Sequence, residues 1–495
     1  MATPCCWRGL LIRFSVSLFF AVSLILPAAS RVRLIAQPAP AAPTTPPTLV
    51  DLSERLAQIE PLLPLTHLGM ELAPTLPTLV GMNSPQNYLL VVQNSDELRA
   101  TGGFISALGV VTLDKGRLGE IQFIDSYNLF RLDVEYPPPP PPMQQFMGIP
   151  YLLFRDANWS PDLPTTAQLL ISMYRQETGV ELSGVVTVDL HAVELLIGAL
   201  APLSIANVAE PLTGANVLNQ IKQLWAAPTD GVALTASVSD TVSMEWWVQR
   251  KSFIPALAAA VMTKARDPQT DYVRLAQAVQ TALDERSIQI WLKDPAAAAQ
   301  IAMLGWDGSL QPQPAADFLA LVDTNLGYNK ANAVIQRQLA YTVTWPDGAT
   351  APPLATATIT YTHPLNLPGH ICDLTPRYGD DYNHLVERCF YNYLRLYTPA
   401  GSELVSLTGV QPDSVKATRG EHRTQVFGGY FILPPDETQV VQVQYRLPAH
   451  WTPETYALVV QRQAGSGPLP LTLTIDQQST SLTVTRGKLY WTGAK

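Results

Sequence analysis

The sequence has few charged residues and no surplus of positive charge. Asp, Glu, Lys and Arg make up 15% of the 495 residues, against about a quarter in an average soluble protein, and the formal net charge is −9. No stretch gathers lysine and arginine into a basic stripe. Binding to a nucleic-acid backbone depends on such positive charge, so nucleic acid is not expected as a partner.

The sequence also lacks the short motifs that mark common enzyme classes. Its 7 histidines show neither the His-Glu-x-x-His spacing of zinc hydrolases nor pairing with cysteines at zinc-finger spacing. A Gly-x-Ser-x-Gly elbow, a Walker loop and a Gly-x-Gly-x-x-Gly turn are absent as well. We therefore expect no histidine-based catalytic metal, no serine hydrolase and no nucleotide-binding loop.

The N-terminus has the pattern of an export signal. Residues 1–30 carry Arg8 and Arg13, then an apolar core, then the small residues Ala28, Ala29 and Ser30. The core is shorter than the ~20 residues of a full membrane span, so the segment is either a cleaved signal peptide or a signal anchor. Residues 31–50 form a Pro/Ala-rich linker that cannot build a core. The protein is thus predicted to be exported, and either anchored on the outer side of the cell membrane or secreted.

The chain has only four cysteines, and two of them, Cys5 and Cys6, precede the apolar core. The exported portion keeps Cys372 and Cys389, with a polar segment between them. An oxidising compartment allows a disulfide across this loop, and two buried thiols are the alternative.

Residues 51–310 alternate between strand and helix patterns, which favours an α/β mixed-sheet sandwich. Its predicted strands span 88–92, 104–113, 119–124 and 184–189, and its predicted helices span 165–178, 191–200, 217–225, 244–266 and 272–292. Residues 137–142 are six consecutive prolines, which we expect to form an exposed extended excursion.

Residues 311–495 show short segments of alternating apolar and polar residues separated by turn signals, which predicts an all-β, antiparallel sandwich domain. Residues 323–330, before the first of these segments, are predicted to be a loop between the domains.

The chemistry in the sequence lies mainly in an arginine and carboxylate set near the ends of the first strands. Arginine recognises phosphate and aspartate holds Mg²⁺, so the set suits a pyrophosphate head group; the alternative is solvated loop charge with a structural ion pair. Aromatic loops at 126–129, 157–160 and 305–308 would add apolar walls to such a site, or pack into the core. The set comprises Asp96, Glu97, Arg99, Asp125, Arg131, Asp133, Arg155, Asp156 and Asp162.

Three segments resemble the bacterial domain-of-unknown-function 4012 family. They are Gln-Asn-Ser-Asp-Glu-Leu-Arg-Ala-Thr-Gly-Gly-Phe-Ile at 93–105, Ala-Asn-Trp-Ser-Pro-Asp at 157–162 and Asp-Thr-Asn-Leu-Gly-Tyr-Asn-Lys at 323–330. The resemblance spans roughly residues 85–440. It implies an exported or membrane-anchored protein and an architecture, but no activity.

Residues 178–200 are similar to a segment of LytR-CpsA-Psr domains in which a strand leads into a helix. Those domains transfer glycopolymers from polyprenyl pyrophosphate carriers to the cell wall, with arginines on the pyrophosphate and an aspartate beside Mg²⁺. This resemblance implies that Arg99 matches one such arginine and that Asp125 matches the aspartate. The chain departs from the pattern because Ile124, not arginine, precedes Asp125.

Two functions remain as alternatives. The first is a glycopolymer phosphotransferase at the membrane or cell wall, acting on a polyprenyl-linked glycan. It would have Arg99 and Asp125 as catalytic residues, Arg99, Arg155, Asp156 and Arg250 on the substrate, and Mg²⁺ on Asp125. The second is a non-catalytic envelope scaffold or carbohydrate- or protein-binding module. Arg99, Asp125 and Arg155 around an apolar groove would favour the transferase, and Arg99 closed into a buried ion pair would favour the scaffold.

Overall fold

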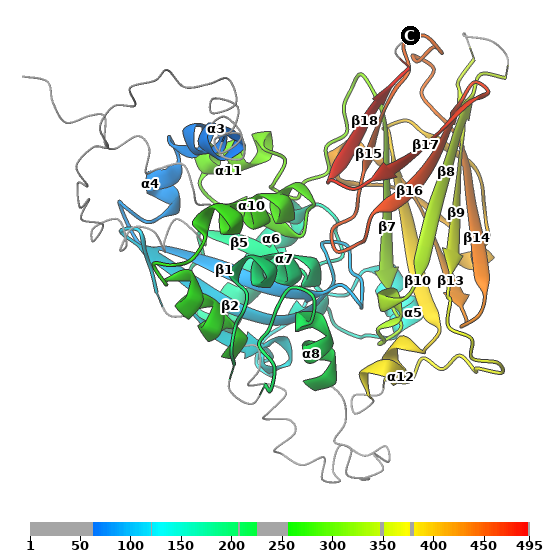
Figure 1. Cartoon of the computed structure of the whole chain (residues 1–495). Helices are drawn as coiled ribbons and strands as arrows, with labels where there is room; N and C mark the ends of the chain where they lie inside the picture. The colour runs from blue at the N-terminus through cyan, green and yellow to red at the C-terminus, as the bar shows by residue number, and fades with distance from the viewer. Residues whose placement is uncertain are drawn as a thin grey trace, which may run out of the picture.

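The computed structural model describes residues 63–119, 121–205, 208–224, 256–346, 351–376 and 381–493. An N-terminal region with a mixed α/β sheet is followed by a mostly β C-terminal region with two mixed sheets, and the two regions lie side by side (Figure 1). The predicted signal and linker, and the predicted substrate residue Arg250, lie outside the described residues. Within the described ranges, no helix is both long enough and apolar enough to span a membrane.

The N-terminal sheet has the strand order β3-β2-β1-β5-β6, and β4 also pairs with β2. Strand β1 runs antiparallel to β2 and parallel to β5, and β6 returns antiparallel to β5. The strands are β1 (Gln86–Asn94), β2 (Phe104–Asp114), β3 (Arg117–Leu118), β4 (Gln122–Asp125), β5 (Gly184–Val188) and β6 (Ile288–Leu292). Strand β1 is apolar on both sides because Leu89 and Val91 enter one core and Leu90 enters the other.

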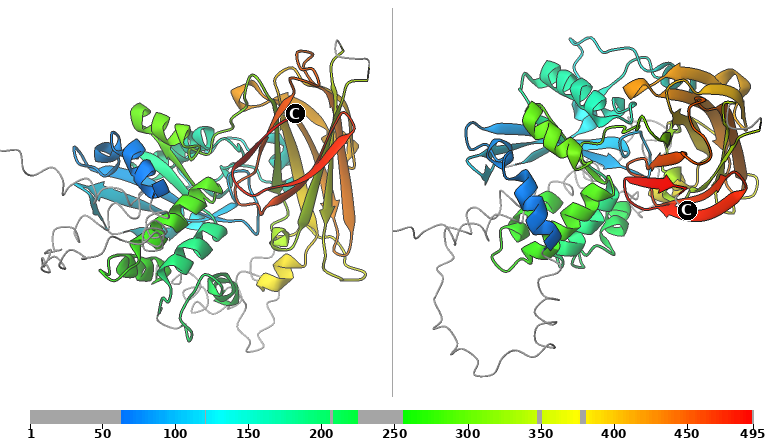
Figure 2. Two further views of the ribbon diagram at one scale, coloured as in Figure 1. Left: turned by 45° about the horizontal axis from the view of Figure 1, so that its top comes forward. Right: turned by 90° about the horizontal axis from the view of Figure 1, so that it is seen from above.

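Helices cover both faces of this sheet. Helix α6 (Leu163–Thr178) packs on the Leu89 face, and α7 (Leu190–Leu200), α10 (Tyr272–Asp284) and α11 (Pro295–Met303) pack on the Leu90 face (Figure 2). Each of the four begins after an aspartate whose carboxylate accepts a backbone N–H of the first turn. The remaining helices of the region include α3 (Leu63–Leu72), α4 (Leu76–Leu79), α5 (Pro141–Met147), α8 (Val217–Leu224) and the short η2 (Ser126–Asn128) and η3 (Phe154–Asp156).

The C-terminal region consists of two stacked sheets with the orders β12-β13-β10-β7-β15-β18 and β11-β14-β9-β8-β16-β17. Side chains such as Tyr341, Ile359, Leu394 and Phe427 fill the space between them, and β9 alternates regularly between buried and half-buried positions. The first sheet contains β7 (Asp317–Asn325), β10 (Phe390–Thr398), β12 (Lys416–Arg419), β13 (Gln425–Leu433), β15 (Ala457–Gln461) and β18 (Lys488–Thr492). The second contains β8 (Gln336–Thr344), β9 (Leu354–Thr362), β11 (Glu403–Thr408), β14 (Thr438–Arg446), β16 (Leu469–Ile475) and β17 (Gln478–Val484). Short helical turns lie between them at α12 (Tyr382–Val386), η4 (Ala331–Ala333), η5 (Pro412–Ser414) and η6 (Glu421–Arg423).

The prediction of purely antiparallel sheets in the C-terminal region was wrong. Strand β15 runs parallel to β7, and β16 runs parallel to β8. The last strands of the chain therefore return beside the first strands of the region, a long-range pairing that no local turn signal encodes.

The structure corrects two further predictions about secondary structure. The predicted helix at 272–292 ends at Asp284, because Arg286 adopts a left-handed backbone (φ 63°) and the alternating residues 288–292 form the buried strand β6. The predicted loop at 323–330 begins with three residues that belong to β7 and are fully buried.

The proline tract is not wholly an exposed extended excursion. Pro139 is buried, and Pro141 and Pro142 open helix α5, where the missing N–H of proline costs no hydrogen bond. Met143 and Met147 bury this helix against Tyr391, Tyr393 and Tyr430 of the C-terminal region. Figure 1 shows α5 beside the strands of that region. Cys372 and Cys389, which join in a disulfide, pack in the same cluster.

Candidate functional site

The loop at 95–103 turns the chain from β1 into β2 and carries the charged part of the first motif. The Asn94 carboxamide accepts the backbone N–H of Asp96 at 3.0 Å, which starts the turn. Gly103 closes it with φ 153°, and a Cβ there would lie 2.3 Å from the Asn94 carbonyl group. Only glycine permits this close approach, and as a result the loop folds inward with Arg99 fully buried.

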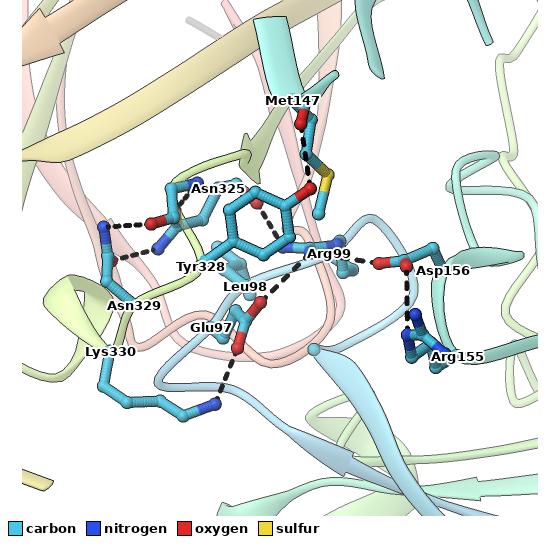
Figure 3. A network of polar contacts seen from close by, with 12 residues as sticks. Glu97, Leu98, Arg99, Met147, Arg155, Asp156, Asn325, Tyr328, Asn329 and Lys330 are labelled. Atoms are coloured by element: carbon cyan, nitrogen blue, oxygen red, sulfur yellow. Dashed lines mark hydrogen bonds and ion pairs between the residues drawn. The ribbon is translucent and has the colours of Figure 1, made fainter. Parts of the chain in front are cut away.

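Arg99 is enclosed by acceptors from three separate segments. Its Nη2 lies 3.1 Å from Glu97 Oε1 and 3.2 Å from Asp156 Oδ1, and its Nη1 donates to the backbone carbonyl of Asn325 (Figure 3). Both carboxylates are also buried. The guanidinium is therefore held in a closed ion pair and presents no face to solvent.

The same cluster joins the two regions of the molecule. Lys330 Nζ lies 2.7 Å from Glu97 Oε2 (Figure 3), and the Asn325 backbone N–H donates to the Leu98 carbonyl at 3.0 Å. From a third direction, the Gln463 carboxamide donates to the Arg99 carbonyl at 3.1 Å. We call Glu97, Arg99, Asp156, Asn325 and Lys330 the latch.

The two carboxylates of the latch respond to their surroundings in opposite directions. Burial acts to raise the pKa of Glu97, but the charges of Lys330 and Arg99 outweigh it and hold this pKa below its ordinary value. Burial raises the pKa of Asp156, which Arg99 and Arg155 only partly offset and which the nearby Glu97 raises further. This electrostatic arrangement maintains an ionised Glu97 between two cations, as a structural ion pair requires.

The structure brings three of the predicted site residues together and places a fourth nearby. Arg155 Nε lies 3.8 Å from Asp156 Oδ2, so Asp156 stands between Arg99 and Arg155 (Figure 3). Arg155 is the accessible member, with 23% of its side chain exposed, and its guanidinium lies 4.6 Å from the ring centre of Tyr127. Asp125 caps η2 by accepting the backbone N–H of the same Tyr127 at 2.9 Å.

These residues do not fit a Mg²⁺ site. Magnesium requires near-octahedral oxygen ligands, whereas Asp156 is paired with two arginines and Asp125 is used as a cap. In the part of the chain that the structure describes, no group of three or more His, Cys, Asp or Glu side chains is placed to hold a metal ion.

An apolar pocket of about 140 Å³ does exist beside the N-terminal sheet, but on the other face. Leu90, Val92 and Phe123 form its floor, and Ile197 and Leu257 are among the residues that cover it. Phe154 and α6 pack on the Leu89 face instead. The pocket is thus separated by the sheet from the η3 segment that carries Arg155 and Asp156.

A larger cavity lies between the two regions, and no local sequence pattern predicts it. It has a volume of about 620 Å³ and lies between α5, the 157–160 loop and strands β10, β12 and β13. The only sequence signal for it was Trp159, in an aromatic loop predicted to form an apolar wall. Arg395, Lys416 and Arg419, which also line it, stand on strands about 240 residues or more further along the chain.

Comparisons with known proteins give a family and little more. No curated protein matches the chain. Solved structures with a similar arrangement include the Lin1025 protein of Listeria innocua, with 10% identity and a TM-score of 0.23 over 46% of this chain and 82% of that one. Another is a candidate nutrient-binding protein of Legionella pneumophila, with 8% identity and a TM-score of 0.19 over 32% of this chain and 54% of that one. Likenesses this low carry no argument about function.

The predicted resemblance to the domain-of-unknown-function 4012 family is confirmed over part of the predicted span of 85–440. The comparisons give no support to the resemblance to LytR-CpsA-Psr domains. The matched segment contains the 93–105 and 157–162 motifs, with Glu97 and Arg99 of the latch in the first and Asp156 directly before the second. Residues 83–223 are a domain of the family described as "Protein of unknown function (DUF4012)".

Proposed function

We propose that this protein is an exported, non-catalytic cell-envelope scaffold whose N-terminal and C-terminal regions act as one rigid unit. The observation that carries the proposal is the closed environment of Arg99. A guanidinium that is fully buried and bound by Glu97, Asp156 and the Asn325 carbonyl is out of reach of a pyrophosphate unless the latch opens.

The surroundings of the latch support a structural role. Contacts across the junction also include His422 Nε2 to Asp162 Oδ1 at 2.8 Å and Arg395 Nη2 to the Trp159 carbonyl at 2.7 Å. Together with the buried latch, these polar contacts favour a fixed relation between the regions over a hinge.

The glycopolymer transferase needs an accessible arginine pair beside a lipid groove. Arg155 is the predicted pyrophosphate residue that keeps partial exposure, and the apolar pocket lies across the sheet from it. Arg155 is therefore the residue on which the two proposals can be separated without disturbing the fold.

The test is calorimetric binding of farnesyl pyrophosphate to the full-length protein, with and without Mg²⁺, and to Arg155→Gln. Arg175→Gln is the matched control, because Arg175 is an exposed arginine of the same region paired with Glu181. The scaffold proposal expects no saturable binding, or equal binding by all three proteins. Binding that Arg155→Gln abolishes and Arg175→Gln retains would overturn it in favour of the transferase.

A further inference from the structure

The cavity between the regions, which we call the junction cleft, has the composition of a ligand site. Its volume of about 620 Å³ falls within the range of small-molecule pockets. Aromatic side chains form much of its wall, and cations stand among them. The aromatic residues are Phe146, Trp159 and Tyr393, and the cations are Arg395, Lys416 and Arg419.

The aromatic part of the cleft is fixed by packing. Phe146 of α5 stacks on Tyr430 with ring centres 4.0 Å apart, and Trp159 and Tyr393 lie 5.7 Å apart. Helix α5 also packs, through Met143 and Met147, in the hydrophobic cluster that contains the Cys372–Cys389 disulfide. The cleft therefore presents a rigid aromatic wall contributed by both regions.

Arg395 is the unusual residue of the cleft. It is 5% exposed, and all its partners are neutral. Its guanidinium lies over the Trp159 ring, 3.9 Å from the ring centre, and it donates to the Trp159 carbonyl at 2.7 Å, the Thr324 hydroxyl at 3.2 Å and the Tyr397 hydroxyl at 3.3 Å. Its Nε has no partner, and among the described residues no carboxylate forms an ion pair with it. A buried charge without a counter-charge is costly, so this guanidinium is suited to receive an anion.

The rim of the cleft is positively charged, as Arg395 is. Lys416 and Arg419 lie on β12, where every residue is exposed, and no acidic side chain in the described ranges pairs with either. Glu421 is the one carboxylate among the lining residues, and it accepts hydrogen bonds from Ser160 and Tyr397. The lining thus has three cations against one carboxylate that is already engaged.

We propose that the junction cleft binds an anionic saccharide. The flat C–H face of a sugar ring would lie on the aromatic wall, its acidic group would take Arg395 and the rim cations, and its hydroxyls would meet the exposed Thr418. The inference rests on the proposed non-catalytic role in one respect only, since the saccharide is held and not cleaved.

Three matched monosaccharides test whether binding depends on the acidic group of the sugar. Glucose, glucuronate and glucose 1-phosphate share one ring and differ in the charged group, so the full-length protein is titrated with each by ligand-observed NMR. We expect both anions to bind about tenfold or more tightly than glucose, as a charge-assisted contact implies. The ratio between the two anions identifies a carboxylate or a phosphate as the natural group.

Variants locate the binding. The double variant Lys416→Gln, Arg419→Gln alters only exposed side chains and should weaken anion binding between about twofold and tenfold. Arg395→Gln should weaken it more than tenfold, with near-UV circular dichroism used to check folding. Arg446→Gln, an exposed cation on β14 of the other sheet, is the control and should change nothing.

The outcomes are decisive even if Arg395→Gln fails to fold. Anion binding that the rim double variant weakens and Arg446→Gln preserves supports the site. Absence of binding by both anions, binding equal to that of glucose, or binding that the rim variant leaves unchanged overturns it. None of these results bears on farnesyl pyrophosphate, so the scaffold proposal stands or falls separately.

Discussion

Substitution of Glu97 tests whether the latch holds the molecule together. In Glu97→Gln, the buried cations Arg99 and Lys330 face Asp156 alone, so one buried charge loses its partner. Breaking a buried pair in this way costs about 3–5 kcal/mol, a large part of the ~5–15 kcal/mol by which a typical domain is stable. We expect a loss of that size, measured by urea unfolding at pH 7.

A double-mutant cycle and a surface control make this prediction specific. Adding Lys330→Met restores charge balance, because Arg99 and Asp156 then remain as one neutral pair, so the double variant should recover ~1–3 kcal/mol relative to the sum of the single variants. Arg131→Gln breaks a short ion pair with Asp133 whose side chains are 49% and 67% exposed, and it should leave the free energy of unfolding nearly unchanged, because solvent screens an exposed pair.

The pH dependence has a defined sign. Because Glu97 has a lowered pKa in the folded protein, its contribution is present above its ordinary pKa of 4.5 and disappears as the pH falls through the lowered value. The gap between wild type and Glu97→Gln should therefore narrow below pH 4.5. A loss under 1 kcal/mol at pH 7, or an additive cycle, would refute the idea that the latch stabilises the junction.

Three further expectations concern single sites. Burial raises the pKa of Asp317 from 3.8 to about 6, so wild type should lose ~3 kcal/mol as the pH rises through this window, and Asp317→Asn, compared by urea unfolding at pH 4 and pH 7, should lack that loss. Gly103→Ala should lower stability by at least ~2 kcal/mol in the same assay, whereas Gly467→Ala, at an open position, should be nearly neutral. Cys372→Ser opens a disulfide that spans 17 residues and should cost ~3 kcal/mol; an unchanged thermal midpoint on reduction would contradict this.

Local chemistry explains what could be predicted from the sequence. The apolar run of β1 and the helical patterns of α6 and α7 are signals within a few residues, and the structure has each element where they indicate. Glu97, Arg99 and Asp156 were also identified as one charged set. The sequence left open whether they bind a ligand or form a structural ion pair, because the residues that close the latch, Asn325 and Lys330, lie more than 220 residues beyond Glu97 and Arg99.

The junction cleft was missed for a different reason. In a sheet with one solvated face, alternate residues of β10 would be exposed, but all nine are buried because α5 and the 157–160 loop cover the outer face. Arg395 is therefore buried by a segment more than 230 residues earlier in the chain, as its bond to the Trp159 carbonyl shows. Strand periodicity alone could not reveal that contact.

The contact between Gln463 and the Arg99 carbonyl has a consequence for biogenesis. The two residues are 364 positions apart, so a ribosome working at ~5–20 residues per second makes the second roughly 20 to 70 s after the first. Until Asn325 and Lys330 are made, which takes more than half of that interval, the N-terminal region carries Arg99 and Glu97 without the residues that close the latch. The growing chain thus has a long period of exposure to proteases and chaperones, and a chain that stops before residue 463 would leave its first domain incomplete as well as its last.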